Sequence, residues 1–178
     1  MKYWPVPDSY LKILPKDGSP GSFWENRGDR FHCGVDIYAP YNSNVISIDK
    51  GMVIKTGIFT SPKKVEYWNE TKYVIIKNQD GFYCKYAELR DLFVKKKESV
   101  DAGQLIAIVG TVLNIRKIKN TSPTYVQKLK DRGNNSMLHF ELYSSQPFDS
   151  TKYLGGNWFG NNKLKNLLNP EIELKNLL

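Results

Sequence analysis

The segment that decides the fold lies late in the chain, at residues 137–143, where the sequence reads MLHFELY. Its apolar and aromatic residues are typical of a β-strand. Because side chains point alternately to the two faces of a strand, Met137, His139 and Glu141 share one face. The segment therefore predicts a strand that presents an imidazole and a carboxylate together.

Five other segments also have the character of short strands, and turn residues separate them. The turn at Asn78–Gly81 joins two of them and indicates a β-hairpin. Short strands at regular spacing predict a single all-β domain with antiparallel pairing, either a sandwich or a barrel-like sheet. The five segments are Val45–Ile48, Met52–Thr56, Tyr73–Lys77, Phe82–Tyr86 and Gln104–Val109.

Short helices are expected only at the periphery. Pro123 favours a helix that runs to Lys130, and Asn169 with Pro170 favours another near the C-terminus. The segment 145–165 is rich in Gly and Asn and is predicted to be a loop. We expect residues 1–21 to form an irregular arm, which leaves residues 22–178 as one domain with a C-terminal extension.

Composition excludes several classes of protein. The chain has 178 residues, of which 40% are hydrophobic and 25% charged, as expected of one folded domain and not of a disordered chain. No apolar run reaches the roughly 18 residues of a membrane span, and the N-terminus lacks the apolar region of a signal peptide. The net charge of +8 favours an anionic partner such as a cell-wall polymer, although solubility alone accounts for it too. No motif for nucleic-acid binding accompanies the charge, so nucleic acid is the weaker option.

The first candidates for chemistry are His32 and Asp36. In an extended segment they share a face with Gly34, which leaves room between the imidazole and the carboxylate. Both groups are good zinc ligands. By itself, this pair is a weak signal, because such pairs more often have a structural role.

His139 adds a second imidazole, and His32 and His139 are the only histidines in the chain. Three protein ligands with an open fourth position are the pattern of catalytic zinc sites. The alternative is two unrelated core histidines, each with its own hydrogen-bond partner.

The two cysteines, Cys33 and Cys84, are too few for a disulfide scaffold, and the sequence leaves their pairing open. We expect neither of them to bind zinc. Cys33 should point away from the metal because it lies on the strand face opposite His32. By the same alternation, Cys84 would share a strand face with Glu88, which is a further candidate site residue.

Six motifs, in order along the chain, resemble those of the LytM/lysostaphin-type zinc endopeptidases. Residues 31–40, FHCGVDIYAP, are similar to the H-x-G-x-D segment of that family and the A-P that follows it, and residues 137–141 lie over its H-L-H-F-E strand. The remaining four are residues 22–27, 49–53, 102–110 and 168–172. The resemblance covers most of the chain and implies the all-β fold known as the duplicated hybrid motif.

By this resemblance, His32, Asp36 and His139 hold one zinc ion per chain. Two further histidines of the family are replaced here. Glu88 stands at the histidine of Y-x-H-L, because residues 86–89 are YAEL, and Met137 stands at the first histidine of H-x-H. The combination of Y-x-E-L with M-L-H-F-E resembles a divergent subgroup of the family.

The two replacements differ in their chemistry. Met137 can neither donate a strong hydrogen bond nor exchange a proton near neutral pH. Glu88 can act as a general base toward water on zinc; the alternative is a solvent-facing residue at a strand end. Glu141 is expected to orient His139, or else to form a salt bridge outside the site. Tyr86 is expected to line the groove, or else to lie in the core.

The resemblance therefore implies a zinc-dependent endopeptidase that cleaves peptidoglycan peptides, with zinc-activated water and Glu88 as the candidate base. It also implies a periplasmic or extracellular location. The alternative is a catalytically degenerate module that binds the cell wall or a partner protein, and the loss of both histidines favours it. The sequence leaves the oligomeric state and the cleaved bond open.

Overall fold

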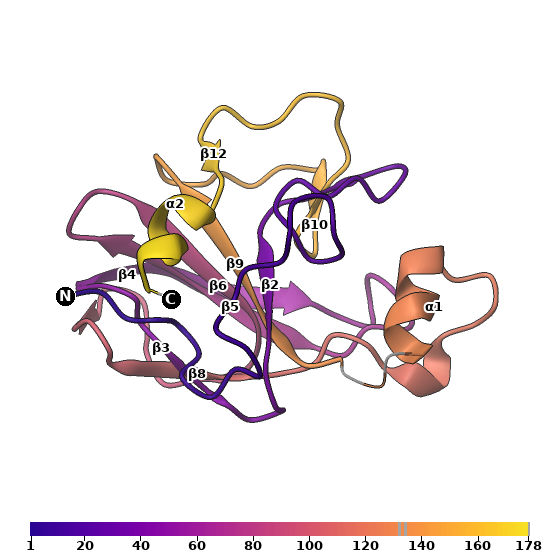
Figure 1. Ribbon diagram of the computed structural model, residues 1–178, viewed down its shortest axis with the longest axis horizontal. Helices are drawn as coiled ribbons and strands as arrows, with labels where there is room; N and C mark the ends of the chain where they lie inside the picture. The colour runs from indigo at the N-terminus through magenta and orange to yellow at the C-terminus, as the bar shows by residue number, and fades with distance from the viewer. Residues whose placement is uncertain (132, 134, 178) are drawn as a thin grey trace.

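An antiparallel β-sheet forms the body of the protein in the computed structural model, which describes residues 1–131, 133 and 135–177 (Figure 1). Within these residues the sheet has nine strands, and six of them lie in the order β12-β9-β6-β5-β4-β7. β2 pairs with β9, and β8 pairs with both β6 and β3. The strands are β2 (Val35–Tyr38), β3 (Asn44–Ile46), β4 (Gly51–Thr60), β5 (Thr71–Asn78), β6 (Tyr83–Leu92), β7 (Ser99–Val100), β8 (Leu105–Val109), β9 (Met137–Tyr143) and β12 (Leu167–Leu168).

A small second sheet and four short helical segments complete the described part of the chain. The second sheet has the order β1-β11-β10. Figure 1 shows α1 at one end of the molecule and both chain termini at the other. The elements are β1 (Phe31–His32), β10 (Tyr153–Leu154), β11 (Asn157–Trp158), α1 (Thr124–Asp131), α2 (Glu171–Leu174) and the 3-10 helices η1 (Ile115–Lys117) and η2 (Lys175–Leu177).

The predicted fold class is confirmed, because every strand pairing in both sheets is antiparallel and the helices are short. α1 begins directly after Pro123, and the backbone N–H of Glu171 at the start of α2 donates to Oδ1 of Asn169 at 3.1 Å. The prediction for residues 145–165 is partly wrong, because β10 and β11 lie inside that segment. Two-residue strands are too short to produce an alternating pattern.

The main hydrophobic core packs against one face of the large sheet. Tyr86 and Phe140 meet there edge to face, with 5.2 Å between ring centroids. The N-terminal arm has no strand or helix up to residue 21, yet Trp4 and Val6 are buried in the same core. Backbone hydrogen bonds attach it, since the N–H of Tyr3 donates to the carbonyl of Ile48 at 2.9 Å. The arm is therefore part of the packed structure, and a domain boundary near residue 21 remains a prediction.

A smaller apolar cluster joins α1 to the loops beside the large sheet. Val126 of α1 packs there with Trp68, Val112 and Leu113. This cluster matters for the site, because it forms one wall of the cavity described below. Among the described residues, no helix is long and apolar enough to cross a membrane.

Candidate metal centre

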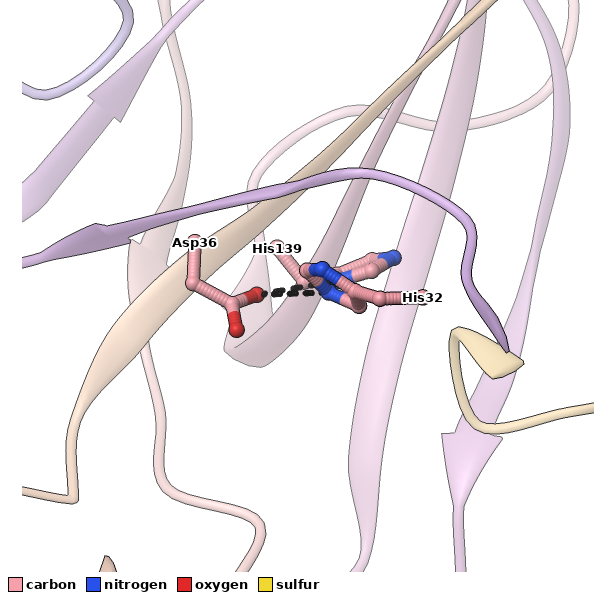
Figure 2. Close-up of side chains that lie close together, drawn as sticks. All are labelled: His32, Asp36 and His139. Atoms are coloured by element: carbon pink, nitrogen blue, oxygen red, sulfur yellow. Dashed lines mark hydrogen bonds and ion pairs between the residues drawn. The ribbon is translucent and has the colours of Figure 1, made fainter. Parts of the chain in front are cut away.

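The pairing of β2 with β9 brings the two halves of the predicted metal site together. Asp36 in β2 lies directly opposite His139 in β9, and His32 ends β1 just before β2 (Figure 2). Gly34 allows this approach. A Cβ atom at position 34 would lie 2.3 Å from the carbonyl oxygen of Phe140 and 3.0 Å from the ring of His139. Only glycine fits between the two chain segments that carry the site.

Three potential ligand atoms form a compact triangle. Nε2 of His32 lies 3.0 Å from Nδ1 of His139 and 3.1 Å from Oδ1 of Asp36, and the third side, from Nδ1 of His139 to Oδ1 of Asp36, is 3.0 Å. Bonds of about 2.0–2.1 Å in a tetrahedral zinc site place neighbouring donors roughly 3.3 Å apart. The triangle needs to widen by only a few tenths of an ångström, so the residues present fit a zinc ion.

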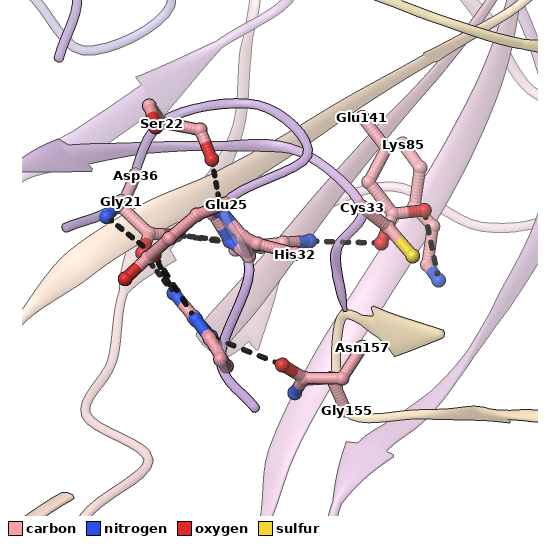
Figure 3. Close-up of polar contacts among 12 residues, drawn as sticks. Gly21, Ser22, Glu25, His32, Cys33, Asp36, Lys85, Glu141, Gly155 and Asn157 are labelled. Carbon is pink, nitrogen blue, oxygen red and sulfur yellow. Dashed lines mark hydrogen bonds and ion pairs between the residues drawn. The ribbon is translucent and has the colours of Figure 1, made fainter. Parts of the chain in front are cut away.

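The outer nitrogen of each imidazole already has an acceptor, as Figure 3 shows for Ser22 and Glu141. Nδ1 of His32 lies 2.8 Å from the carbonyl oxygen of Ser22, so this nitrogen donates and Nε2 keeps its lone pair. Nε2 of His139 lies 2.8 Å from Oε1 of Glu141 and must donate in turn. With a metal bound, Nε2 of His32 and Nδ1 of His139 would therefore both offer their lone pairs to it, as metal binding requires.

Burial and neighbouring charges set the protonation of the ligands. Burial lowers the pKa of His32. Burial alone would raise the pKa of Asp36, but the charges and hydrogen bonds of His32 and His139 hold it well below its usual range. Burial also acts to lower the pKa of His139, yet the hydrogen bonds and charges of Asp36 and Glu141 outweigh it and raise that pKa to about 9. When no metal is bound, this raised pKa favours the protonated form of His139. The imidazolium then supplies the positive charge that a metal ion would bring to the site.

Glu88 reaches the same region because of a β-bulge in β6. Tyr86 pairs with Val74 and Leu89 with Lys72, so two residues of β6 stand opposite one residue of β5. Regular alternation would put Tyr86 and Leu89 on opposite faces, but both are buried in the core. The extra residue turns Glu88 to the face that carries the metal site, and its backbone adopts a φ of 63°. Such strain is uncommon for a residue other than glycine and is concentrated at functional sites.

The carboxylate of Glu88 lines a cavity of about 50 Å³ with Asp36, Met137 and Asn135. Its Oε2 is buried and has no hydrogen-bond partner within the described part of the chain, and the same holds for Oδ1 of Asn135. Burial and the negative charge of Asp36 raise the pKa of Glu88 to about 8, against the opposite effects of His139 and Arg27. Glu88 does not belong to the His32, Asp36 and His139 cluster, whose ligand atoms lie within 4.8 Å of one another.

Sequence comparison identifies the family. A sequence model of Peptidase family M23 matches residues 30–150, which is more than half of the chain and includes His32, Asp36, His139 and Glu88. The chain belongs to peptidase family M23. No curated protein sequence matches it significantly.

Solved M23 structures have the same fold at low sequence identity. Lysostaphin from Staphylococcus simulans superposes with a TM-score of 0.57 and 18% identity over 99% of this chain, and this chain covers 56% of its length. The catalytic domain of lysostaphin alone gives a TM-score of 0.50 and 18% identity over 98% of this chain and 92% of that domain. LytU gives a TM-score of 0.52 and 19% identity over 89% of this chain and 81% of its own.

Three other expectations for this M23 chain concern Tyr86 and the cysteines. Tyr86 does not line the groove; its ring is buried in the core, and its hydroxyl accepts the backbone N–H of Ile48 at 2.9 Å. The bulge explains the correction, because Tyr86 and Glu88 lie on opposite faces. Cys84 packs in the same core, and Cys33 is buried in a separate apolar cluster. The two thiols are unpaired, and neither lies in the ligand cluster.

Sequence reasoning assigned no role to the residues that surround this M23 site, although Arg27 is the last residue of the motif at residues 22–27. Arg27 lies 3.5 Å from the second oxygen of Asp36 and donates to Asn157 of β11 at 3.1 Å. Lys85 and Tyr153 contact Glu141 behind His139. Lys85 gave a weak signal, as the one charged residue of the predicted strand Phe82–Tyr86, but Tyr153 and Asn157 gave none, because they come from the segment predicted to be a loop.

Proposed function

We propose that this M23 chain is a zinc-dependent endopeptidase that acts on peptidoglycan peptides, with Glu88 as general base. The observation that carries the proposal is the carboxylate of Glu88, which has a buried oxygen without a partner among the described residues and lines the same small cavity as Asp36, one of the three candidate ligands. Unpaired buried polar atoms are rare in folded proteins and need an explanation. A role toward a ligand or water in the cavity is the simplest one.

His32, Asp36 and His139 would hold the zinc ion. When bound, zinc would polarise the scissile carbonyl and lower the pKa of water. Glu88 would accept a proton from the attacking water at Oε2 and later pass it to the leaving amine. Met137 is buried in the same cavity and can do neither.

The substrate would enter beside the ligands. A cavity of about 230 Å³ lies over β4, β5 and β6, and Phe59 and Tyr153 are among its walls. Phe59 also stacks on His139, with 5.5 Å between ring centroids. Gly155 lines both this cavity and the smaller one that contains Glu88. A peptide that crosses the metal site would therefore extend into the larger cavity.

Peptidoglycan digestion by the zinc-loaded protein, measured as the release of new amino groups, tests the proposal. Glu88→Gln should keep the fold and the zinc but lower the rate by about 10²–10⁴-fold, as expected for removal of a general base. The matched control is Glu66→Gln, because Glu66 is an exposed carboxylate that pairs with Lys119 at 3.0 Å. Equal rates for wild type and Glu88→Gln would show that the base is wrongly assigned.

The second candidate is a catalytically degenerate module that binds cell wall or a partner protein. This alternative is favoured by the loss of both catalytic histidines of the LytM/lysostaphin-type endopeptidases, which Met137 and Glu88 replace here. A zinc-loaded wild type that cosediments with peptidoglycan but releases no peptide would support this alternative. Met137→His then gives a further comparison, because it returns a hydrogen-bond donor to the cavity and should raise activity only in an enzyme.

A further inference from the structure

The face of the sheet behind His139 holds a buried ion pair that the peptidase chemistry does not use. Glu141 has no solvent exposure, and Lys85 is 6% exposed. Nζ of Lys85 lies 3.4 Å from Oε2 of Glu141, and three aromatic rings enclose the ammonium, with their centroids at 4.0 Å (Tyr153), 5.1 Å (Phe59) and 5.2 Å (Tyr73). Figure 3 shows Lys85 and Glu141 on the side of the site away from Asp36.

The donors around Glu141 form a directed chain that begins at Lys85. An ammonium group can only donate, so the hydroxyl oxygen of Tyr153 accepts from Lys85. The single hydroxyl hydrogen of Tyr153 then points to Oε1 of Glu141, at 2.5 Å, and Tyr143 donates to Oε2 at 2.5 Å. With donors on both oxygens, Glu141 is left as an acceptor toward Nε2 of His139.

We propose that Lys85 is a positioning residue that fixes the hydrogen on Nε2 of His139 and so keeps Nδ1 available as a zinc ligand. Lys85 touches no ligand atom; it acts through Tyr153 and Glu141. Among the described residues, two basic side chains lie within ion-pair distance of Glu141: His139 and Lys85. Removing Lys85 would leave a buried carboxylate whose charge is balanced by His139 alone.

This inference rests on the metal site and not on peptidase activity, so its test uses zinc without any substrate. Competition with a chelator should show that Lys85→Met binds zinc about 10–100-fold more weakly than wild type, the usual loss when a partner of a metal-bound histidine is removed. The matched control is Lys55→Met. Lys55 lines the cavity of about 230 Å³ together with Lys85, but it pairs with the exposed Asp149 at 2.7 Å. Its removal should therefore leave zinc affinity unchanged.

A nitrogen-15 NMR spectrum of the zinc-loaded protein separates positioning from general stability. The chain has two histidines, so two ring N–H signals are expected, one on His139 toward Glu141 and one on His32 toward Ser22. In Lys85→Met the His139 proton should shift upfield and exchange faster with water, while the His32 proton stays unchanged. Unchanged zinc affinity together with an unchanged His139 signal would overturn the proposal.

A double mutant covers the case in which Lys85→Met does not fold. Lys85→Met/Glu141→Gln removes both buried charges, and replacing a buried pair is tolerated far better than breaking one. If Lys85 acts only through Glu141, the double mutant and Glu141→Gln alone should bind zinc with equal affinity. A further tenfold loss on adding Lys85→Met to Glu141→Gln would contradict the proposed route.

Discussion

The two walls of the metal cavity differ in how completely their polar groups are paired. On the wall formed by β1, β2 and β9, both outer imidazole nitrogens have acceptors, and Glu141 receives a hydrogen bond at each oxygen. On the wall that holds Glu88 and Asn135, one oxygen of each side chain is buried without a partner in the described part of the chain. A fully paired wall fixes the geometry of ligands, whereas an unpaired wall is poised to bind something else.

Removing a ligand from the paired wall should have the largest effect. Wild type should carry about one zinc per chain, and His139→Ala should lose nearly all of it, because the two remaining ligands cannot close the site. Elemental analysis after dialysis measures the difference. Met137→Ala is the matched control, since Met137 is buried on the same face of β9 but is not a ligand. Full retention of zinc by a His32→Ala/His139→Ala double mutant would mean that the metal binds elsewhere.

The second prediction tests how tightly the paired wall is built. Gly34→Ala places a Cβ 2.3 Å from the backbone oxygen of Phe140, which cannot move without breaking the β2–β9 pairing. We expect a loss of about 2–3 kcal/mol in the free energy of unfolding, together with weaker zinc binding. Urea denaturation measures the first and chelator competition the second.

Gly57→Ala is the control for that measurement. Its Cβ would meet the ring of Tyr73 at 2.9 Å, but a side chain can rotate away. It should therefore destabilise the protein less than Gly34→Ala and leave zinc affinity unchanged. Equal losses for both variants would show that β2 and β9 are less closely packed than the structure has them.

The third prediction concerns the unpaired wall and has a defined pH dependence. The pKa of Glu88 is raised to about 8 in the folded protein, against an ordinary value of 4.5. Between these values the folded state binds more protons at this site than the unfolded state, so stability falls as pH rises from about 5 to 8. Glu88→Gln should remove this pH-dependent loss of stability, because glutamine does not ionise.

Thermal unfolding in the presence of a chelator measures that difference. The melting temperature of Glu88→Gln minus that of wild type should grow as pH rises from 5 to 8 and then level off. Taking a difference cancels the groups that titrate independently of Glu88. A gap between the two proteins that does not change with pH would mean that Glu88 is not desolvated in the folded state.

The fold and the grouping of His32, Asp36 and His139 were predictable from sequence, because both depend on local patterns and on the motifs shared with the family. Alternation fixes the face of His139 within β9, and Gly34 with its two neighbouring ligands forms one short motif. The partners of those ligands were not predictable in the same way. Tyr153 comes from a two-residue strand without an alternating pattern, and Lys85 gains its role only when β6 pairs with β9.

The error at Tyr86 has one physical cause. Strict alternation gives Cys84, Tyr86 and Glu88 a common face, so it places Tyr86 on the same side of the strand as the candidate base. The bulge in β6 interrupts the alternation of side chains between Tyr86 and Leu89. No residue type in the segment YAEL predicts such a bulge. A β-bulge depends on how neighbouring strands are held in register, and that is information beyond the strand itself.

The smallest expected effect follows from this bulge and compares the two faces of β6. Cys84 lies in the core, where its Sγ accepts from Nδ2 of Asn78 at 3.3 Å, whereas Lys85 and Glu88 lie on the face toward the site. Cys84→Ser should therefore leave zinc content unchanged. A serine hydroxyl can keep the bond to Asn78, so the loss of stability should be only about 1 kcal/mol. Loss of zinc from a folded Cys84→Ser protein would place Cys84 on the metal face and remove the bulge as the reason that Glu88 reaches the site.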